Sequence, residues 1–152
     1  MSCKEKFYSE KFRIDPCDFV EFRCRISQAY LEALSWIALY YYKGVASWSW
    51  YYPFHYSPFA SDIRVALYNN QAFDKGQPFK PFEQLMAVFP KKTSWAIPQC
   101  LQPLITEMDS PIADYFPTDF VIDTLGKKFA WLGEVLLPFI QEDRLLEAMA
   151  GY

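Results

Sequence analysis

The longest regular pattern of apolar residues in the chain spans residues 19–43. Apolar side chains recur there every three or four positions, which is the spacing of one face of an α-helix. The positions are Phe19, Phe22, Ile26, Tyr30, Ala33, Ile37 and Tyr40 or Tyr41. Asp18 and Glu21 have the spacing of a capping box at its start, and Gly44 is typical of a helix end. The pattern predicts one long helix whose C-terminal half, apolar almost all round, is buried on several sides.

Shorter patterns predict further helices, several of them bounded by proline. They are a lead-in helix around residues 5–12, a helix over 82–89 that Pro90 stops, a helix that starts at Pro98 and ends at 109–111, and a closing helix over 141–150. Residues 61–64 are expected to begin another short helix. Residues 120–123 predict a strand, 124–127 a turn and 128–131 the returning strand of a hairpin.

Together these elements predict a mainly α fold. We expect an irregular helical domain with a long N-terminal helix, proline-stiffened loops and one small β-hairpin. The length of 152 residues suits a single domain over 1–152, and 52% hydrophobic residues are enough to build a core. No apolar run reaches the length of about 18 residues that predicts a membrane span, and the N-terminus lacks the apolar stretch of a secretory signal.

The residues Trp48–Phe59, called here the aromatic segment, have the sequence WSWYYPFHYSPF. Eight of these twelve residues are Trp, Tyr, Phe or His, and Pro53 and Pro58 exclude a helix interior. We expect a rigid extended segment that follows the long helix. In an extended chain, alternation places the indoles of Trp48 and Trp50 on one face. Such a pair is either part of the core or a stacking platform for a planar ligand.

Little else in the sequence suggests chemistry. The net charge of −3 lacks the excess of basic residues typical of a free-standing nucleic-acid-binding protein. His55 is the only histidine, which excludes a multi-histidine metal site, and neither a glycine-rich phosphate loop nor a GxSxG motif is present. The four cysteines form no CxxC pair, so a zinc ribbon is unfavourable. We expect reduced thiols, with Cys24 on the core face of the long helix.

Three blocks of the sequence resemble the 5′→3′ exoribonuclease family (the XRN family). They are YYYKGVASWSWYYPFHYSPFASDI at 40–63, GQPFKPFEQLMAVFP at 76–90, and SPIADYFPTDFVIDTLGKKFAWLGEVLLPFIQEDRLLEA at 110–148. Their order and spacing are those of the family's second conserved region, and residues 7–12 resemble its lead-in. Two positions depart from the family pattern: Leu132 stands where Gln is usual, and Gln141 where Asp is usual.

The resemblance implies a function for a larger parent enzyme. Members of the family processively degrade 5′-monophosphorylated single-stranded RNA, with Mg²⁺ held by a first conserved region that these residues do not contain. The chain is then expected to be a fragment that binds no metal and is inactive alone. It would pack on the missing first conserved region, shape the active-site mouth and supply an RNA-stacking tryptophan, Trp48 or Trp50. An intracellular location is implied, with the cytoplasm favoured over the nucleus.

His55 and Arg64 are further candidate contacts to RNA or to the active-site mouth, against the competing interpretations of a structural imidazole and a solvated guanidinium. Two other functions remain open. One is an autonomous module whose aromatic and proline-rich surface binds a proline-rich peptide or a sugar. The other is a scaffold that docks to a nuclease in trans. Because the face expected to meet the missing region is aromatic, we also expect the fragment to self-associate.

Overall fold

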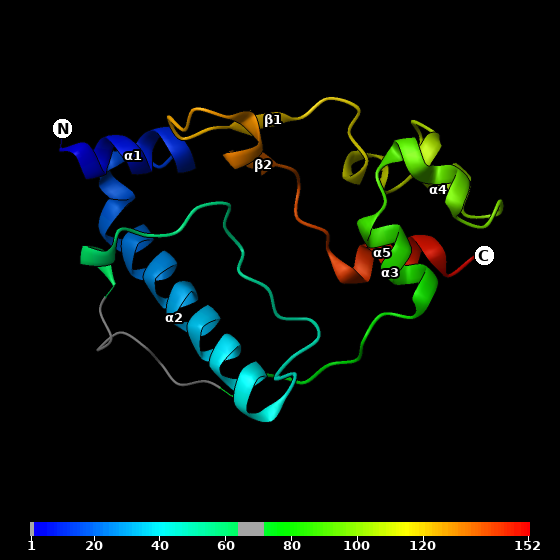
Figure 1. Cartoon of the computed structure of the whole chain (residues 1–152), viewed down its shortest axis with the longest axis horizontal. Coiled ribbons are helices and arrows are strands. Elements are labelled where there is room, and N and C mark those ends of the chain that lie inside the picture. The colour runs from blue at the N-terminus through cyan, green and yellow to red at the C-terminus, as the bar shows by residue number, and fades with distance from the viewer. Residues whose placement is uncertain (1, 64–71) are drawn as a thin grey trace. The chain divides into compact units, whose positions relative to one another are not determined.

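The computed structural model describes residues 2–63 and 72–152. The chain divides into two compact units, Met1–Gln77 (unit 1) and Pro78–Tyr152 (unit 2). Over these described residues the fold is mainly helical with one two-stranded antiparallel sheet, as the sequence predicts (Figure 1). The expectation that residues 1–152 behave as one domain stays a prediction.

Unit 1 is built on one long helix. Helix α1 (Cys3–Phe12) leads through the 3₁₀ turn η1 (Pro16–Asp18) into α2 (Phe19–Lys43), which has the predicted bounds. The chain then leaves the C-terminal end of α2 and returns along the helix to a second 3₁₀ turn, η2 (Ala60–Asp62), as Figure 1 shows. The aromatic segment is this returning strand-like stretch, so it lies against the helix that precedes it.

The two ends of α2 differ in how far the sequence predicts them. Gly44 ends the helix with a φ of 91°, and its N–H donates to the Tyr40 carbonyl, as expected for a C-terminal glycine. The predicted Asp18 cap is wrong, because Asp18 has helical backbone angles and its side chain makes no capping bond. A capping side chain needs an extended backbone at that position. The capping box lies instead at α1, where Ser2 and Glu5 bond each other's backbone N–H.

The core of unit 1 is aromatic. Rings from α1, the first half of α2 and the aromatic segment pack against one another, mostly edge to face, with centroid separations of 4.9–6.3 Å. The buried residues are Tyr8, Phe19, Phe22 and Ile26, with Phe7, Phe12, Ile14, Tyr52, Phe54 and Phe59 packed against them. Each such ring pair contributes roughly 0.5–1.5 kcal/mol beyond the area that it buries. The aromatic segment is therefore mostly core material after its first residues.

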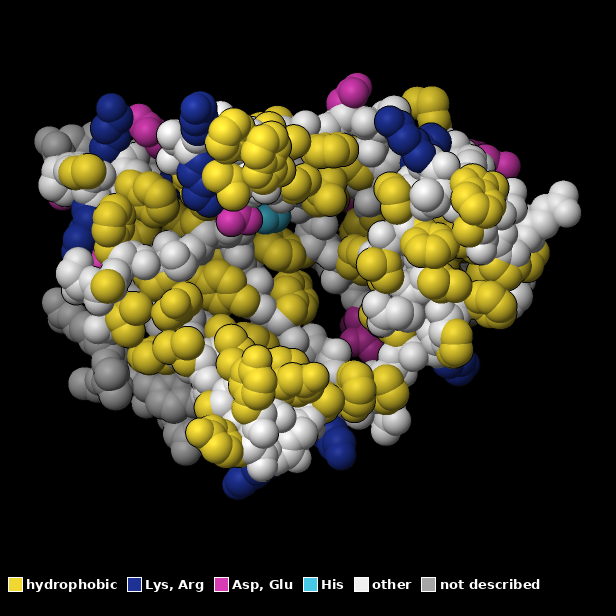
Figure 2. Space-filling view, viewed as in Figure 1, with side chains coloured by type: hydrophobic (Ala, Val, Ile, Leu, Met, Phe, Trp, Pro, Cys, Tyr) yellow, Lys and Arg dark blue, Asp and Glu magenta, His cyan; other side chains and the backbone are white. Residues whose placement is uncertain are grey.

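The predicted burial of the C-terminal half of α2 is wrong. The buried residues of α2 all lie in its first half, between Phe19 and Ala29. Leu34, Ile37 and Tyr40 are about half exposed, and Tyr42 is 89% exposed. Figure 2 shows hydrophobic side chains gathered over this end of the helix. The prediction for Cys24 is also wrong, because this thiol is exposed, as are those of the other three cysteines.

Unit 2 packs three short helices around a mainly aliphatic core. They are α3 (Pro81–Val88), α4 (Gln102–Thr106) and α5 (Glu142–Met149), with 3₁₀ turns η4 (Lys91–Ala96), η5 (Ala113–Tyr115) and η6 (Ala130–Leu132) between them. The core residues are Met86, Ile97, Leu101, Leu104, Ile105, Ile112, Phe116 and Leu145. The predicted start of α4 at Pro98 is four residues early. Pro103 lies in the first turn of α4, where a missing N–H costs nothing.

The hairpin exists, but its second strand is not where the sequence predicts it. β1 (Val121–Asp123) pairs with β2 (Glu134–Leu136), so that Asp123 faces Glu134, and residues 128–131 are not a strand. The chain first forms η6 and reaches β1 only at Gly133. A Cβ on Gly133 would lie 2.7 Å from Ile122 Cγ2 and 2.9 Å from the Asp123 carbonyl oxygen. The missing side chain at this position therefore allows the approach of the returning strand.

Candidate nucleic-acid interface

The backbone at the start of the aromatic segment is held by a buried serine. Ser47 is 3% exposed, and its hydroxyl accepts the N–H of Trp50 at 3.1 Å. Its carbonyl accepts the indole N–H of Trp36, on α2, at 3.1 Å. The N–H of Trp48 donates to the Lys75 carbonyl at 2.9 Å. Residues from α2 and from the chain just before unit 2 thus fix the backbone on both sides of Trp48.

The hydrogen bond from Trp48 to the Lys75 carbonyl depends on the glycine that follows Lys75. Gly76 follows Lys75 and has a φ of 60°, a conformation that residues with a side chain rarely adopt. A Cβ at Gly76 would also lie 3.1 Å from the Ser49 hydroxyl oxygen. This glycine therefore lets the chain pass close to the loop that carries Trp48.

The two candidate tryptophans have different environments. Trp48 is 50% exposed, and no other ring among the described residues packs against its indole. Trp50 is less exposed, and its ring packs edge to face with that of Phe73 at a centroid separation of 5.6 Å and an interplanar angle of 76°. A half-open cleft of about 300 Å³ lies beside Trp50. Its other lining residues are Glu32, Ser47, Ser49, Ala72, Phe73 and Asp74.

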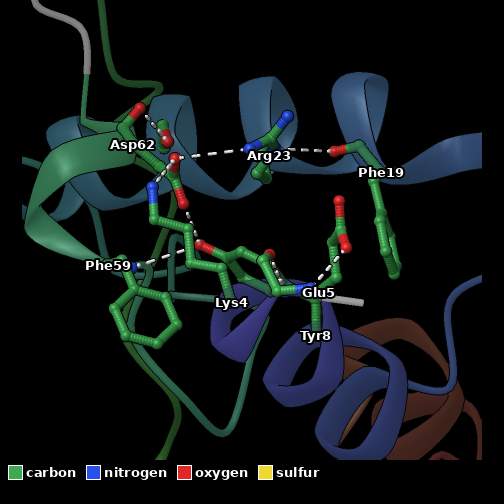
Figure 3. Close-up of polar contacts among 9 residues, drawn as sticks. Lys4, Glu5, Tyr8, Phe19, Arg23, Phe59 and Asp62 are labelled. Carbon is green, nitrogen blue, oxygen red and sulfur yellow. Dashed lines mark hydrogen bonds and ion pairs between the residues drawn. The ribbon is translucent and has the colours of Figure 1, made fainter. Parts of the chain in front are cut away.

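The C-terminal end of the aromatic segment is held by Asp62, which lies in η2 (Figure 3). Its carboxylate accepts hydrogen bonds from Lys4 Nζ at 2.7 Å and from the Tyr8 hydroxyl at 2.8 Å, and Arg23 Nη1 lies 3.7 Å away. Its backbone carbonyl accepts the Ser27 hydroxyl. We call Asp62 with these four residues the Asp62 cluster. It connects α1, α2 and η2.

The contacts of the Asp62 cluster and its burial shift the pKa values of Asp62 and Tyr8. Burial raises the pKa of Asp62, but the hydrogen bonds from Lys4 and Tyr8 and the nearby positive charges outweigh it, so that its pKa is lowered overall. Burial raises the pKa of Tyr8 to about 12, assisted by its bond to Asp62. The Tyr8 hydroxyl also accepts the N–H of Phe59, so it joins the end of the aromatic segment to α1.

The remaining candidate residues give a mixed result. His55 lies partly buried within the aromatic segment, and its role stays a prediction. Arg64 lies outside the described residues. Ser47, Gly76 and Asp62 position the segment but were not singled out from the sequence. An isolated polar residue or glycine carries no signal until the fold brings its partners, up to 58 residues away, beside it.

A metal centre does not fit the residues that the structure describes. Within residues 2–63 and 72–152, no three side chains of His, Cys, Asp or Glu converge as ligands of one ion would. None of the helices in these ranges combines the length and hydropathy that a membrane crossing needs.

Comparison with known protein families gives a match over nearly the whole chain. The model of the family described as the Xrn1 helical domain matches residues 2–152. The chain belongs to this family. The resemblance expected from the three sequence blocks is thereby confirmed.

Curated relatives of this Xrn1 helical domain are much longer proteins. The chain is 52% identical over 146 residues to 5′-3′ exoribonuclease 2 of Emericella nidulans, 48% over 148 residues to that of Arabidopsis thaliana, and 43% over 145 residues to that of Saccharomyces cerevisiae. These alignments cover 95–97% of this chain but only 14–15% of each relative. The relatives' names say nothing about a compartment, so the expectation of a cytoplasmic location stays a prediction.

Proposed function

We propose that this chain is the helical part of a 5′→3′ exoribonuclease that degrades 5′-monophosphorylated single-stranded RNA. In the parent enzyme it packs on the catalytic region, shapes the mouth of the active site, and holds the RNA by stacking a base on Trp48. Membership of the Xrn1 helical domain family carries the proposal, because relatives that match 95% or more of this chain are named 5′-3′ exoribonuclease 2.

Trp48 is a better candidate than Trp50 for the stacking residue. Half of the Trp48 surface is exposed, whereas the Phe73 ring packs against Trp50. The backbone of Trp48 is held from both sides, so a base that binds to its indole meets a surface that is already ordered. Stacking on an aromatic ring contributes roughly 1–3 kcal/mol per base and tolerates any base. An enzyme that degrades RNA of any sequence needs contacts of this kind.

RNA binding and RNA hydrolysis would fall to different parts of the parent protein. Hydrolysis would depend on Mg²⁺ and on carboxylates in the rest of the parent protein, since the described residues do not fit a metal centre. This chain's residues position the RNA and limit access to the active site. We therefore expect no RNA cleavage by the chain alone, with or without Mg²⁺.

A separate peptide- or sugar-binding module is a weaker alternative. An autonomous module of that kind would present most of its aromatic segment to the ligand. Here Tyr52, Phe54, Tyr56 and Phe59 are wholly or partly buried in the core of unit 1 instead. Only the first residues of the segment are well placed to meet a ligand.

Reconstitution tests the proposal. The chain is mixed with a separately produced first conserved region of the parent enzyme, and the loss of 5′-monophosphorylated single-stranded RNA is followed in Mg²⁺. Activity is expected only in the mixture. Trp48→Ala should lower it about tenfold, because a stacked base is lost, while Trp48→Phe should retain part of it.

Trp95→Ala is the matched control, since Trp95 is 78% exposed but lies in η4 of unit 2. It should leave the rate unchanged. Cleavage by the chain alone would contradict the proposal that catalysis lies in the rest of the parent enzyme. A mixture that is as active with Trp48→Ala as without it would contradict the stacking role of Trp48.

A further inference from the structure

A second pair of aromatic rings is exposed in unit 2. Phe129 and Trp131 stack on each other with centroids 4.3 Å apart and planes 9° from parallel. Trp131 lies in η6 and is 77% exposed, although it is one of the largest apolar side chains of the unit. Phe129 covers one face of the indole, and most of the rest is open to solvent. The pair thus presents one flat indole face to solvent, with Phe129 packed behind it.

Two cations lie beside this pair. The ammonium of Lys128 is over the Phe129 ring, 5.3 Å from its centroid. Lys127 Nζ donates to the Leu132 carbonyl at 2.7 Å, which places its charge one residue after Trp131. The nearest carboxylates in sequence, Asp123 and Glu134, face each other at the ends of β1 and β2. The Asp123 carboxylate accepts the N–H of Leu125 and is occupied by the turn.

The geometry points to a second stacking platform for single-stranded nucleic acid. We infer that an unpaired base stacks on the open face of Trp131, while Lys127 contacts the phosphate next to it. Lys128, over the far face of Phe129, adds positive charge to the path of the strand. Aromatic faces alternating with basic side chains are what proteins use to hold single strands without reading their sequence. The inference rests on the proposed function, because it takes RNA as the ligand, but it concerns residues in the other unit from Trp48.

The stacked arrangement distinguishes this site from the other exposed indole of unit 2. Trp95 is as exposed as Trp131, yet no described ring stacks on it. Phe129 restrains the Trp131 indole before any ligand arrives, so that less side-chain entropy is lost on binding. A protein surface is the competing occupant, because other apolar side chains of the hairpin are also exposed (Figure 2). The two lysines favour a polyanion over an apolar surface.

Binding of a fluorescein-labelled single-stranded oligouridylate to the full chain tests the inference. Anisotropy at low salt gives the affinity, and sedimentation gives the oligomeric state. Trp131→Ala should weaken RNA binding about tenfold, and Trp95→Ala should change it less than twofold. Trp131→Tyr keeps a stacking ring and should restore most of the affinity. Replacing Lys127 and Lys128 by Gln should reduce the dependence of affinity on salt.

Several outcomes would overturn the inference. The first is the absence of RNA binding at low salt, and the second is an equal loss of RNA affinity in Trp131→Ala and Trp95→Ala. The third is a Trp131→Ala variant that binds RNA normally, even if it no longer self-associates. Trp48→Ala separates this inference from the proposed function. If only Trp48→Ala weakens binding, the platform on Trp131 is wrong and the role of Trp48 stands. If only Trp131→Ala weakens binding, the platform on Trp131 stands and the stacking role of Trp48 is wrong.

Discussion

At the scale of single residues, Asp62 contacts four side chains from two helices. One carboxylate and one carbonyl join two helices and the end of the aromatic segment, through residues as far apart in sequence as Lys4 and Asp62. The carboxylate is nearly buried, with 8% of its side chain exposed, yet it is fully paired. Breaking one side of such an arrangement leaves buried donors without an acceptor, which costs more than the net value of the bonds.

We therefore expect Asp62→Asn to lower the free energy of unfolding by about 2 kcal/mol. The change keeps the shape of the side chain but removes the charge that Lys4 and Tyr8 contact. Chemical denaturation followed by tyrosine and tryptophan fluorescence measures the effect. Asp109→Asn, an exposed carboxylate in unit 2, is the control and should change stability by less than about 0.5 kcal/mol.

The same carboxylate predicts a dependence on pH. Because the pKa of Asp62 is lower in the folded chain than in the unfolded one, its stabilisation is complete above the unfolded value of about 3.9. It is lost as the pH falls from there through the folded pKa. The stability difference between the parent chain and Asp62→Asn should therefore shrink below about pH 4. A difference that stays constant in this range would show that the charge is not involved.

At the scale of elements, the pairing of the two hairpin strands depends on the glycine at position 133. Gly133→Ala should destabilise it, because the new Cβ meets a backbone carbonyl oxygen at 2.9 Å. We expect a loss of about 1–3 kcal/mol, with faster hydrogen exchange at the amides of β1 and β2. Gly151→Ala is the matched control, since a Cβ there has open space. Equal effects of the two changes would contradict this account of the hairpin.

Elements with a repeating pattern could be predicted from the sequence, and those fixed by a close approach could not. The bounds of α2 follow from a periodicity that runs through 25 residues and from Gly44. The start of β2 depends on the contact of Gly133 with β1, which no local pattern records. The burial of α2 also failed, because periodicity identifies an apolar face but not whether the chain itself covers that face. In this chain the described residues leave that face of α2 exposed to solvent.

At the scale of the whole molecule, the exposed C-terminal half of α2 predicts self-association. Apolar and aromatic side chains on neighbouring turns form a surface that water does not favour. The chain should show a sedimentation coefficient that rises with concentration. Ile37→Asp should suppress the rise, because it places a charge in this surface. Val20→Asp is the control, an exposed position in the first half of the same helix, and a similar effect of both changes would count against a specific contact.

The Asp62 cluster also sets an order of events during folding. Helix α2 needs only contacts between residues four apart, and such helices form in about a microsecond or less. The docking of α1 is different, since Lys4 and Tyr8 contact a residue 58 and 54 positions later in the chain. The whole stretch from Lys4 to Asp62 must therefore leave the ribosome before α1 can dock in this way. Until then the rings of α1 can pack on Phe22 of α2 but lack the contacts that the aromatic segment supplies. We expect the nascent chain to be most exposed to chaperones and to aggregation during this interval.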